Sequence, residues 1–256
     1  MRIVRRLRQS EIMVRTPDDQ EPTRPPPSRN LTRGMLESLG RSIVVGDYEE
    51  KPFPTEADLS NEFGVSRSVT REAVKMLTAK GLLSARPRSG TVVEPPSKWN
   101  LFDPDVLSWL LSRRFKPELL RHFSELRVAI EPEAAALAAQ SDNRELKVGI
   151  AAGLERMRKA ELGEDDTLDA DIAFHVAVLS ASGNPFYAQF RDMVETALRT
   201  SIRFTNQIKG RTASVADHEA VCNAILRGDA DGARKHMRRL IDDVLVLLDR
   251  EEPAVA

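Results

Sequence analysis

Residues 55–93 read TEADLSNEFGVSRSVTREAVKMLTAKGLLSARPRSGTVV, and this stretch decides the fold of the N-terminal half of the chain. Thr55 and Asp58 are three residues apart, a spacing typical of a capping box at the start of a helix. Gly64 is expected to end this short helix, because glycine turns tightly without steric cost. Ser66 is placed to cap a second helix. The stretch therefore predicts two helices joined by a tight turn.

Two short apolar runs follow the second helix, at residues 82–84 and 91–93. Gly81 ends the helix before the first run, and a basic turn at residues 86–90 separates the two runs. Short apolar segments on either side of a glycine-containing turn are typical of a β-hairpin. The whole unit is therefore predicted to be a helix-turn-helix followed by a two-stranded wing.

The polar residues of this unit point to DNA binding. Recognition helices present their N-terminal end to base edges in the major groove. Arginine can bond both acceptors of a guanine, serine can bond phosphate or base, and basic residues on a wing can reach a phosphate or the minor groove. A solvated basic face is the alternative, but it does not explain why these residues occur in this order. The expected DNA contacts are Ser66, Arg67, Ser68, Arg71, Arg86, Arg88 and Gly90.

This stretch resembles the winged helix-turn-helix of the GntR family of bacterial repressors. The matching segments are Pro54–Ser60, Gly64–Arg67, Arg71–Val74, Leu77, Gly81–Leu83 and Arg88–Thr91. The resemblance implies a dimeric repressor with residues 66–71 in the major groove. Some members carry a DNA-contacting arginine at the position of Ala57, and we expect that contact to be missing here.

Length and composition limit the class of protein. With 256 residues, the chain is long enough for two domains that each bury a core. A net charge of −1 does not exclude DNA binding, because non-specific affinity depends on the phosphates neutralised. The single cysteine, Cys222, argues against a disulfide scaffold and fits a reducing cytosol. No apolar run approaches the ~18 residues of a membrane span, so we expect a cytoplasmic protein.

The chain is expected to divide into four segments. Residues 1–29 are basic and rich in proline and are expected to form a disordered tail, although their arginines could touch DNA phosphates. Residues 30–95 form the DNA-binding domain, and residues 96–116 form a linker that runs into a helix. Residues 117–251 form a helical effector-binding and dimerisation domain.

Three aromatic residues of the linker, Trp99, Phe102 and Trp109, are expected to clamp the two domains together. Stacking on a ligand is the alternative role. Asp103 is expected to cap the linker helix, with Pro104 in its first turn.

After residue 117 only helical patterns are found. Apolar residues recur at helical spacing in six stretches, at 118–140, 143–161, 166–182, 185–208, 214–227 and 229–250. The fold class is therefore mainly α: a winged helix-turn-helix followed by an all-α antiparallel bundle. The interior of such a bundle can hold a ligand.

This half resembles the FCD effector-binding domain of the FadR-type branch of GntR regulators. The residues that carry the resemblance are Leu126–Glu131, Asp171–His175, Gly183–Pro185, Asp217–His218, Ala224–Ile225 and Gly228–Asp229. The linker at residues 98–111 is similar to that of regulators of sugar-acid operons. The resemblance implies a repressor of a sugar-acid, galactonate-like catabolic operon, released from its operator by the acid. A regulator of a lactate, uronate or fatty-acid pathway, and a metal-dependent enzyme fused to a DNA-binding domain, are the alternatives.

Asp171 and His175 are four residues apart and share one helix face. A carboxylate and an imidazole there can bind a divalent metal, and His218 on a later helix could close the site. A hydrogen-bonded pair is the alternative. The resemblance implies that these positions are metal ligands and that a further histidine usually stands where this chain has Leu240, so that ligand is absent here. His236, one turn earlier on the same face, could replace it, and a surface role for His236 is the favoured alternative. The expected cofactor is a divalent metal such as zinc, nickel or manganese.

Arg127 lies among apolar residues, and a guanidinium is rarely buried without an anionic partner. A salt bridge with Glu131, one turn further on, is one explanation. The resemblance to acid-sensing regulators implies instead that Arg127 binds the carboxylate of the effector. The expected effector site comprises Arg127, Asp171, His175, Arg203, Asn206 and His218.

The sequence contains no glycine-rich phosphate loop, no serine elbow and no His-Glu-x-x-His run. Cys222 falls on an apolar helix stripe and is expected to be packed rather than nucleophilic. We therefore predict no enzyme activity. The expected partners are double-stranded operator DNA, a small carboxylate effector and a second copy of the chain. A constitutive architectural DNA binder is the alternative.

Overall fold

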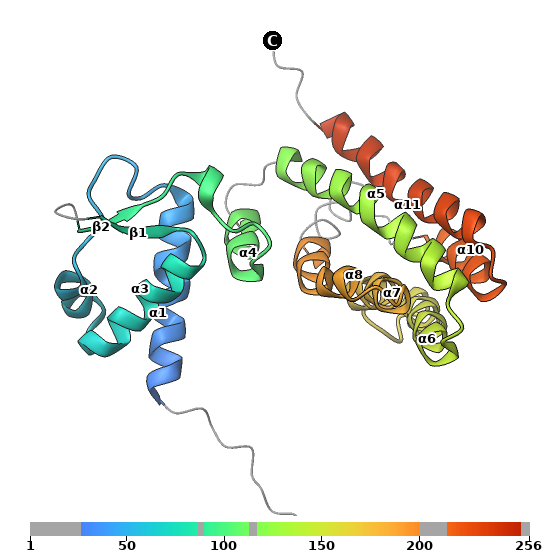
Figure 1. Ribbon diagram of the computed structural model, residues 1–256, viewed down its shortest axis with the longest axis horizontal. Coiled ribbons are helices and arrows are strands. Elements are labelled where there is room, and N and C mark those ends of the chain that lie inside the picture. The colour runs from blue at the N-terminus through green and yellow to red at the C-terminus, as the bar shows by residue number, and fades with distance from the viewer. Residues whose placement is uncertain (1–26, 87–89, 113–116, 200–213, 252–256) are drawn as a thin grey trace, which may run out of the picture.

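The computed structural model describes residues 27–86, 90–112, 117–199 and 214–251. Within these ranges the chain forms an N-terminal unit of helices with a small sheet and a C-terminal unit of helices alone (Figure 1). The predicted fold class, a winged helix-turn-helix followed by a helical bundle, is confirmed.

The N-terminal unit consists of α1 (Pro27–Val45), α2 (Glu56–Phe63), α3 (Arg67–Ala79), β1 (Leu83–Arg86) and β2 (Gly90–Val93). The two strands are antiparallel, with Leu83 opposite Val93 and Arg86 opposite Gly90. Helix α1 begins at Pro27, so residues 27–29, which the sequence assigned to the tail, belong to a helix. Residues 1–26 of that tail lie outside the described residues.

The turn between α2 and α3 forms as the sequence predicted. The backbone N–H of Asp58 donates to Thr55 Oγ1 at 3.2 Å, and the N–H of Thr55 donates to Asp58 Oδ2 at 3.2 Å. Gly64 ends α2 in the left-handed conformation, with φ of 61°. The Ser66 side chain accepts from the backbone N–H of Val69. These caps fix where the recognition helix α3 begins, and therefore which residues lie at its exposed end.

The linker contributes η1 (Pro96–Lys98) and α4 (Pro104–Ser112). Both tryptophans are buried in the core of the N-terminal unit, so the prediction that they lie between the two units is wrong. Trp109 packs so closely on α1 that a Cβ added at Gly40 would lie 2.3 Å from its ring. Phe102 alone follows the prediction, because it contacts Phe190 of the helical unit edge to face, with ring centroids 5.9 Å apart.

The C-terminal unit consists of α5 (Pro117–Gln140), α6 (Arg144–Glu161), α7 (Thr167–Ala181), α8 (Pro185–Gln189), a helical segment over residues 191–199, α10 (Val215–Leu226) and α11 (Ala230–Glu251). Helix α5 packs along α11, and α6 packs along α7 (Figure 1). The prediction of one helix over residues 185–208 is wrong, because a turn at Phe190 interrupts it. Residues 200–208 of that stretch lie outside the described part of the chain.

Small residues bring the helices of the bundle close together. Ala134, Ala135 and Ala138 of α5 are buried in the core. A Cβ added at Gly153 of α6 would lie 2.9 Å from the Cα of Phe174 on α7. This close approach holds the middle of α7, with its polar residues, in the bundle interior. None of the described helices is long and apolar enough to cross a membrane.

Candidate functional site

The exposed end of α3 carries the predicted DNA-reading residues. Ser66, Arg67, Ser68 and Arg71 are all exposed there. The hydroxyls of Ser66 and Ser68 lie 2.8 Å apart. Arg71 Nε donates to Glu56 Oε2 of α2 at 3.4 Å. The arrangement leaves two guanidiniums and two hydroxyls able to reach one groove.

The wing places Arg86 at the end of β1, beside Gly90 of β2, and both residues are exposed. The Arg86 guanidinium lies 3.8 Å from Glu94 Oε1. Glu94 is buried, and its pKa is held below the ordinary value by the Ser84 hydroxyl and the Lys98 ammonium. The base of the wing is therefore fixed by an ionised carboxylate. Arg88 lies outside the described residues.

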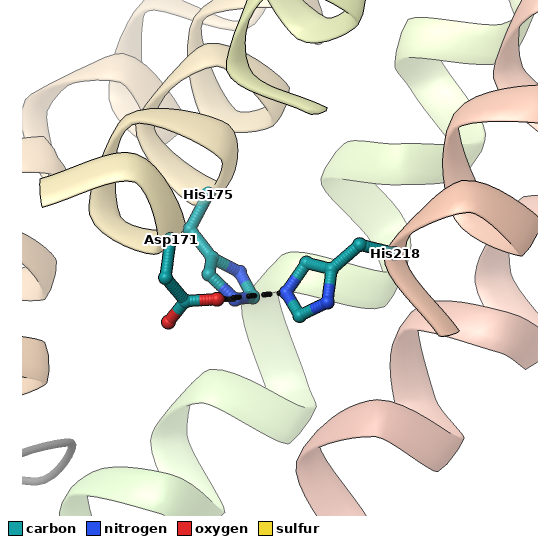
Figure 2. A group of neighbouring side chains, drawn as sticks. All are labelled: Asp171, His175 and His218. Atoms are coloured by element: carbon teal, nitrogen blue, oxygen red, sulfur yellow. Dashed lines mark ion pairs between the residues drawn. The ribbon is translucent and has the colours of Figure 1, made fainter. Parts of the chain in front are cut away.

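The second candidate site is a polar cluster inside the bundle. Asp171 and His175 of α7 face His218 of α10, and one ligand atom of each lies within 4.8 Å of the others (Figure 2). All three side chains are buried, with 4%, 1% and 2% of their surface exposed. The buried ring of Phe174 packs edge to face against both imidazoles. The cluster is thus shielded from water by an aromatic neighbour.

Hydrogen bonds fix which nitrogen of each imidazole faces the cluster. Nδ1 of His218 lies 2.8 Å from the carbonyl oxygen of Ser214, which can only accept. Nδ1 of His175 lies 2.6 Å from Glu131 Oε2. In the neutral rings the proton therefore resides on Nδ1. Both Nε2 atoms then lie on the side of the Asp171 carboxylate, and Arg127 Nη2 also lies 3.3 Å from Nε2 of His175.

Asp171 Oδ1 lies 2.9 Å from His218 Nε2 and 3.8 Å from His175 Nε2. The 2.9 Å contact is an ion pair when His218 is protonated, and neither buried atom has a hydrogen-bond partner among the described residues. The buried Asp171 carboxylate can therefore be neutralised by a proton on His218 or by a cation bound between the three residues. This donor set, one carboxylate oxygen and two imidazole nitrogens, fits a divalent metal.

The charges of the cluster shift the pKa values of its members. Burial alone would raise the pKa of Asp171, but the two histidines outweigh burial and the pKa is lowered. Burial alone would lower the pKa of His218, but contact with Asp171 outweighs burial and the pKa is raised. Burial would likewise raise the pKa of Glu131, yet Arg127 and His175 lower it to about 2. The carboxylates of Asp171 and of the neighbouring Glu131 are therefore both ionised, and together they attract a cation or a proton.

Arg127 lies beside this cluster, with 3% of its surface exposed. Its Nε donates to Glu131 Oε1 at 2.5 Å and its Nη2 to Glu131 Oε2 at 3.3 Å. The same Nη2 lies 3.3 Å from both ring nitrogens of His175. The internal salt bridge with Glu131, one of the two explanations drawn from the sequence, is present in the structure.

The remaining predicted site residues are not brought into the cluster. Leu240 of α11 is half-buried and packs against the apolar core, and His236 is half-buried one turn earlier. The candidate metal ligands among the described residues are limited to Asp171, His175 and His218. Arg203 and Asn206 lie outside the described residues.

Two partners of the histidines were not predicted from the sequence. Glu131 was expected only as a partner of Arg127, and Ser214 was not expected to contact His218. Glu131 and His175 are 44 residues apart, so no spacing rule connects them. The Ser214 contact had a local signal, because a serine four residues before His218 lies one helical turn away.

Comparison with known proteins decides the family. Residues 32–93 match the family described as bacterial regulatory proteins, gntR family, and residues 122–243 match the FCD domain. The chain is 33% identical over 216 residues to the uncharacterized HTH-type transcriptional regulator YieP of Escherichia coli, covering 83% of this chain and 93% of that protein. The chain belongs to the GntR family.

Other relatives of this GntR regulator are named as regulators of particular operons. The galactonate operon transcriptional repressor of Escherichia coli is 32% identical over 209 residues, covering 80% of this chain and 91% of that protein. A putative L-lactate dehydrogenase operon regulatory protein of Escherichia coli is 33% identical over 195 residues, covering 72% of each. These relatives are transcriptional regulators rather than enzymes. The FCD domain places this chain in the FadR-type branch of the family.

Proposed function

We propose that this GntR regulator is a repressor whose affinity for its operator is lowered by a small hydroxy acid, a sugar acid of the galactonate type, bound at the buried cluster with a divalent metal. The observation that carries the proposal is the convergence of Asp171 Oδ1 with Nε2 of His175 and of His218. Both imidazoles have their Nδ1 atoms engaged by acceptors, an arrangement that metal-binding histidines use.

The metal would be held by these same three residues, and zinc, nickel or manganese would each suit the donor set. When bound, it supplies a Lewis acid that can coordinate a carboxylate and a neighbouring hydroxyl. Because Leu240 offers no ligand atom, three protein ligands leave coordination positions open for such a molecule.

The charge of the interior supports an acid as the effector. Arg127 and Glu131 cancel each other, and Asp171 leaves one negative charge when the histidines are neutral. A divalent cation changes this balance to one net positive charge. A monoanionic carboxylate would neutralise that charge, and neutral buried clusters cost least in a low dielectric. The relatives named for galactonate and L-lactate operons support an acid with a hydroxyl next to its carboxylate.

Release of DNA requires that the acid prefer the conformation that binds the operator poorly. A tenfold preference corresponds to ~1.4 kcal/mol. We further propose a homodimer on an inverted repeat, because one winged helix reads few base pairs and two-fold symmetry doubles the contact. A monomer in sedimentation experiments, both with and without operator DNA, would contradict the dimer.

Calorimetry on metal-stripped and metal-reloaded protein tests the site. Galactonate and lactate are compared with hexanoate, which lacks the hydroxyl. We expect hydroxy acids to bind only reloaded protein, and His218→Ala to weaken metal binding by at least about tenfold. His236→Ala is the matched control, because this histidine lies outside the cluster. The proposal would be contradicted if metal-stripped protein bound the acids as tightly as reloaded protein. It would also be contradicted if His218→Ala and His236→Ala bound the metal with the same affinity.

A further inference from the structure

A group of charged side chains joins the C-terminal end of the recognition helix to the linker helix. Lys80, the residue that ends α3, donates from Nζ to both carboxylate oxygens of Asp103, at 2.8 and 2.7 Å. The same Nζ lies 2.8 Å from Asp105 Oδ2. The Lys80 side chain is 12% exposed. This ammonium is therefore enclosed by carboxylates rather than presented to solvent.

Both carboxylates belong to the first turn of α4 and its cap. Asp103 Oδ1 accepts from the backbone N–H groups of Asp105 and Val106, at 3.0 and 3.2 Å. Asp105 also accepts two hydrogen bonds from the Arg33 guanidinium of α1, at 2.9 and 2.6 Å. Two cations and two carboxylates thus tie α1, α3 and α4 to one another.

Backbone contacts strengthen the same junction. The N–H of Asn100 donates to the carbonyl oxygen of Lys80 at 3.0 Å. The linker passes so close that a Cβ added at Gly81 would lie 2.4 Å from the carbonyl oxygen of Lys98. Trp109 of α4 fills the space beside Gly40 of α1. The end of α3 is therefore held by the linker on several sides.

The opposite side of α4 belongs to the helical unit. Val106 and Trp109 are buried in the core of the N-terminal unit, whereas Leu107 and Leu111 are buried in the core of the bundle. Figure 1 shows α4 between the two units. A displacement of the bundle therefore acts on α4 directly, and through Lys80 on the recognition helix.

We propose that Lys80 and Asp105 are positioning residues for DNA reading: they fix α3 to α4, so that the linker helix forms part of the DNA-reading unit. Lys80 and Arg67 lie at opposite ends of α3, ~20 Å apart along its axis. A small tilt at Lys80 then shifts the arginines of the exposed end by more than a hydrogen bond tolerates. The DNA-reading unit then extends beyond residues 95–96 and includes α4.

Binding of full-length protein to operator and to unrelated duplex DNA, measured over a range of salt concentrations, tests this role. In Lys80→Met we expect operator affinity to fall at least about fivefold with little change in affinity for unrelated DNA. The salt dependence should not change, because Lys80 makes no phosphate contact. The Lys80→Arg variant keeps the positive charge and should bind the operator about as tightly as the wild type. Lys235→Met, at an exposed lysine of α11 in the bundle, is the matched control and should leave operator affinity unchanged.

Three results would overturn the proposal. One is operator affinity unchanged in Lys80→Met. Another is a parallel loss on both DNAs with a salt slope reduced by about one, which would indicate a direct phosphate contact. The third is an equal loss in Lys80→Arg. If Lys80→Met does not fold, Asp105→Asn carries the test, because it removes the negative charge that pairs with Lys80 and Arg33 and keeps the shape of the side chain. Asp105→Asn must then lose operator selectivity, and unchanged selectivity contradicts the proposal.

Discussion

The carboxylate of Glu131 and the imidazole of His175 meet inside the bundle, with Glu131 Oε2 and His175 Nδ1 2.6 Å apart and 1% of each side chain exposed. Glu131 also holds Arg127 through both of its oxygens. One carboxylate therefore orients a candidate metal ligand and neutralises a buried guanidinium. The charge of Arg127 is therefore already balanced by Glu131 in the structure.

Glu131→Gln should be strongly destabilising, by about 3–5 kcal/mol, because it leaves the Arg127 charge buried without a partner. The free energy of unfolding, measured with urea on metal-free protein at neutral pH, checks this value. Glu133→Gln is the control, because Glu133 pairs with Arg234 near the surface, where the Arg234 and Glu133 side chains are 39% and 47% exposed. Equal loss in the two variants would contradict the role assigned to Glu131.

The contribution of Glu131 to the free energy of unfolding should depend on pH in a known direction. Its folded pKa, about 2, lies below the ordinary value of 4.5, so its contribution to stability is present above pH 4.5 and is lost as the pH falls toward 2. The difference in unfolding free energy between wild type and Glu131→Gln should therefore shrink over that range. A difference that stays constant between pH 5 and the acid limit of folding would refute the coupling.

Arg67→Ala and Arg71→Ala should each weaken operator binding by ~1–3 kcal/mol and leave the fold intact, because each removes a base or phosphate contact at the exposed end of α3. Fluorescence anisotropy with labelled operator measures the loss. Arg227→Ala, at an exposed arginine that ends α10, is the control. Unchanged affinity in both α3 variants would show that this end of the helix does not read DNA.

Ser124→Ala should be neutral or should stabilise the protein by up to ~1 kcal/mol, although the serine is 1% exposed. The Ser124 hydroxyl has no hydrogen-bond partner among the described residues. Burying an unpaired hydroxyl is unfavourable, and alanine removes this cost. Thermal unfolding of metal-free protein checks the sign. A clear loss of stability would mean that the hydroxyl is bonded in solution.

Two glycines of α6 should respond in opposite directions to alanine. A Cβ at Gly153 would lie 2.9 Å from Phe174 Cα, so Gly153→Ala should destabilise by 1 kcal/mol or more and displace α7. A Cβ at Gly149 would only reach the Cβ of Ala177 at 4.0 Å, so Gly149→Ala should stabilise by ~0.5–1 kcal/mol. Urea unfolding gives the free energy of unfolding of both variants, whose substitutions lie one helical turn apart in α6. The same sign in both would contradict the packing described for α6 and α7.

The sequence predicted the features that depend on short-range chemistry. The capping box at Thr55, the left-handed turn at Gly64 and the cap at Ser66 each involve residues within one helical turn, and all three are present. The pairing of Asp171 and His175 on one face followed from helical spacing alone.

Features that depend on tertiary packing could not be predicted from spacing along the sequence. Trp99 and Trp109 are buried in the core of the N-terminal unit, and for Trp109 the reason is that Gly40 leaves room for its ring against α1. The contact between Glu131 and His175 depends on how α5 lies beside α7. The interruption at Phe190 divides a stretch whose apolar spacing was continuous, and no proline or glycine marks that position.

The proposed repressor depends on a metal held by Asp171, His175 and His218 that couples the binding of a hydroxy acid to release of the operator. The most direct measurement is operator affinity with and without galactonate, on metal-loaded wild type, on metal-stripped wild type and on His218→Ala. We expect the acid to lower the operator affinity of metal-loaded wild type at least about tenfold and to have no effect on the other two proteins. An acid effect of the same size in all three, or none in the metal-loaded wild type, would contradict it.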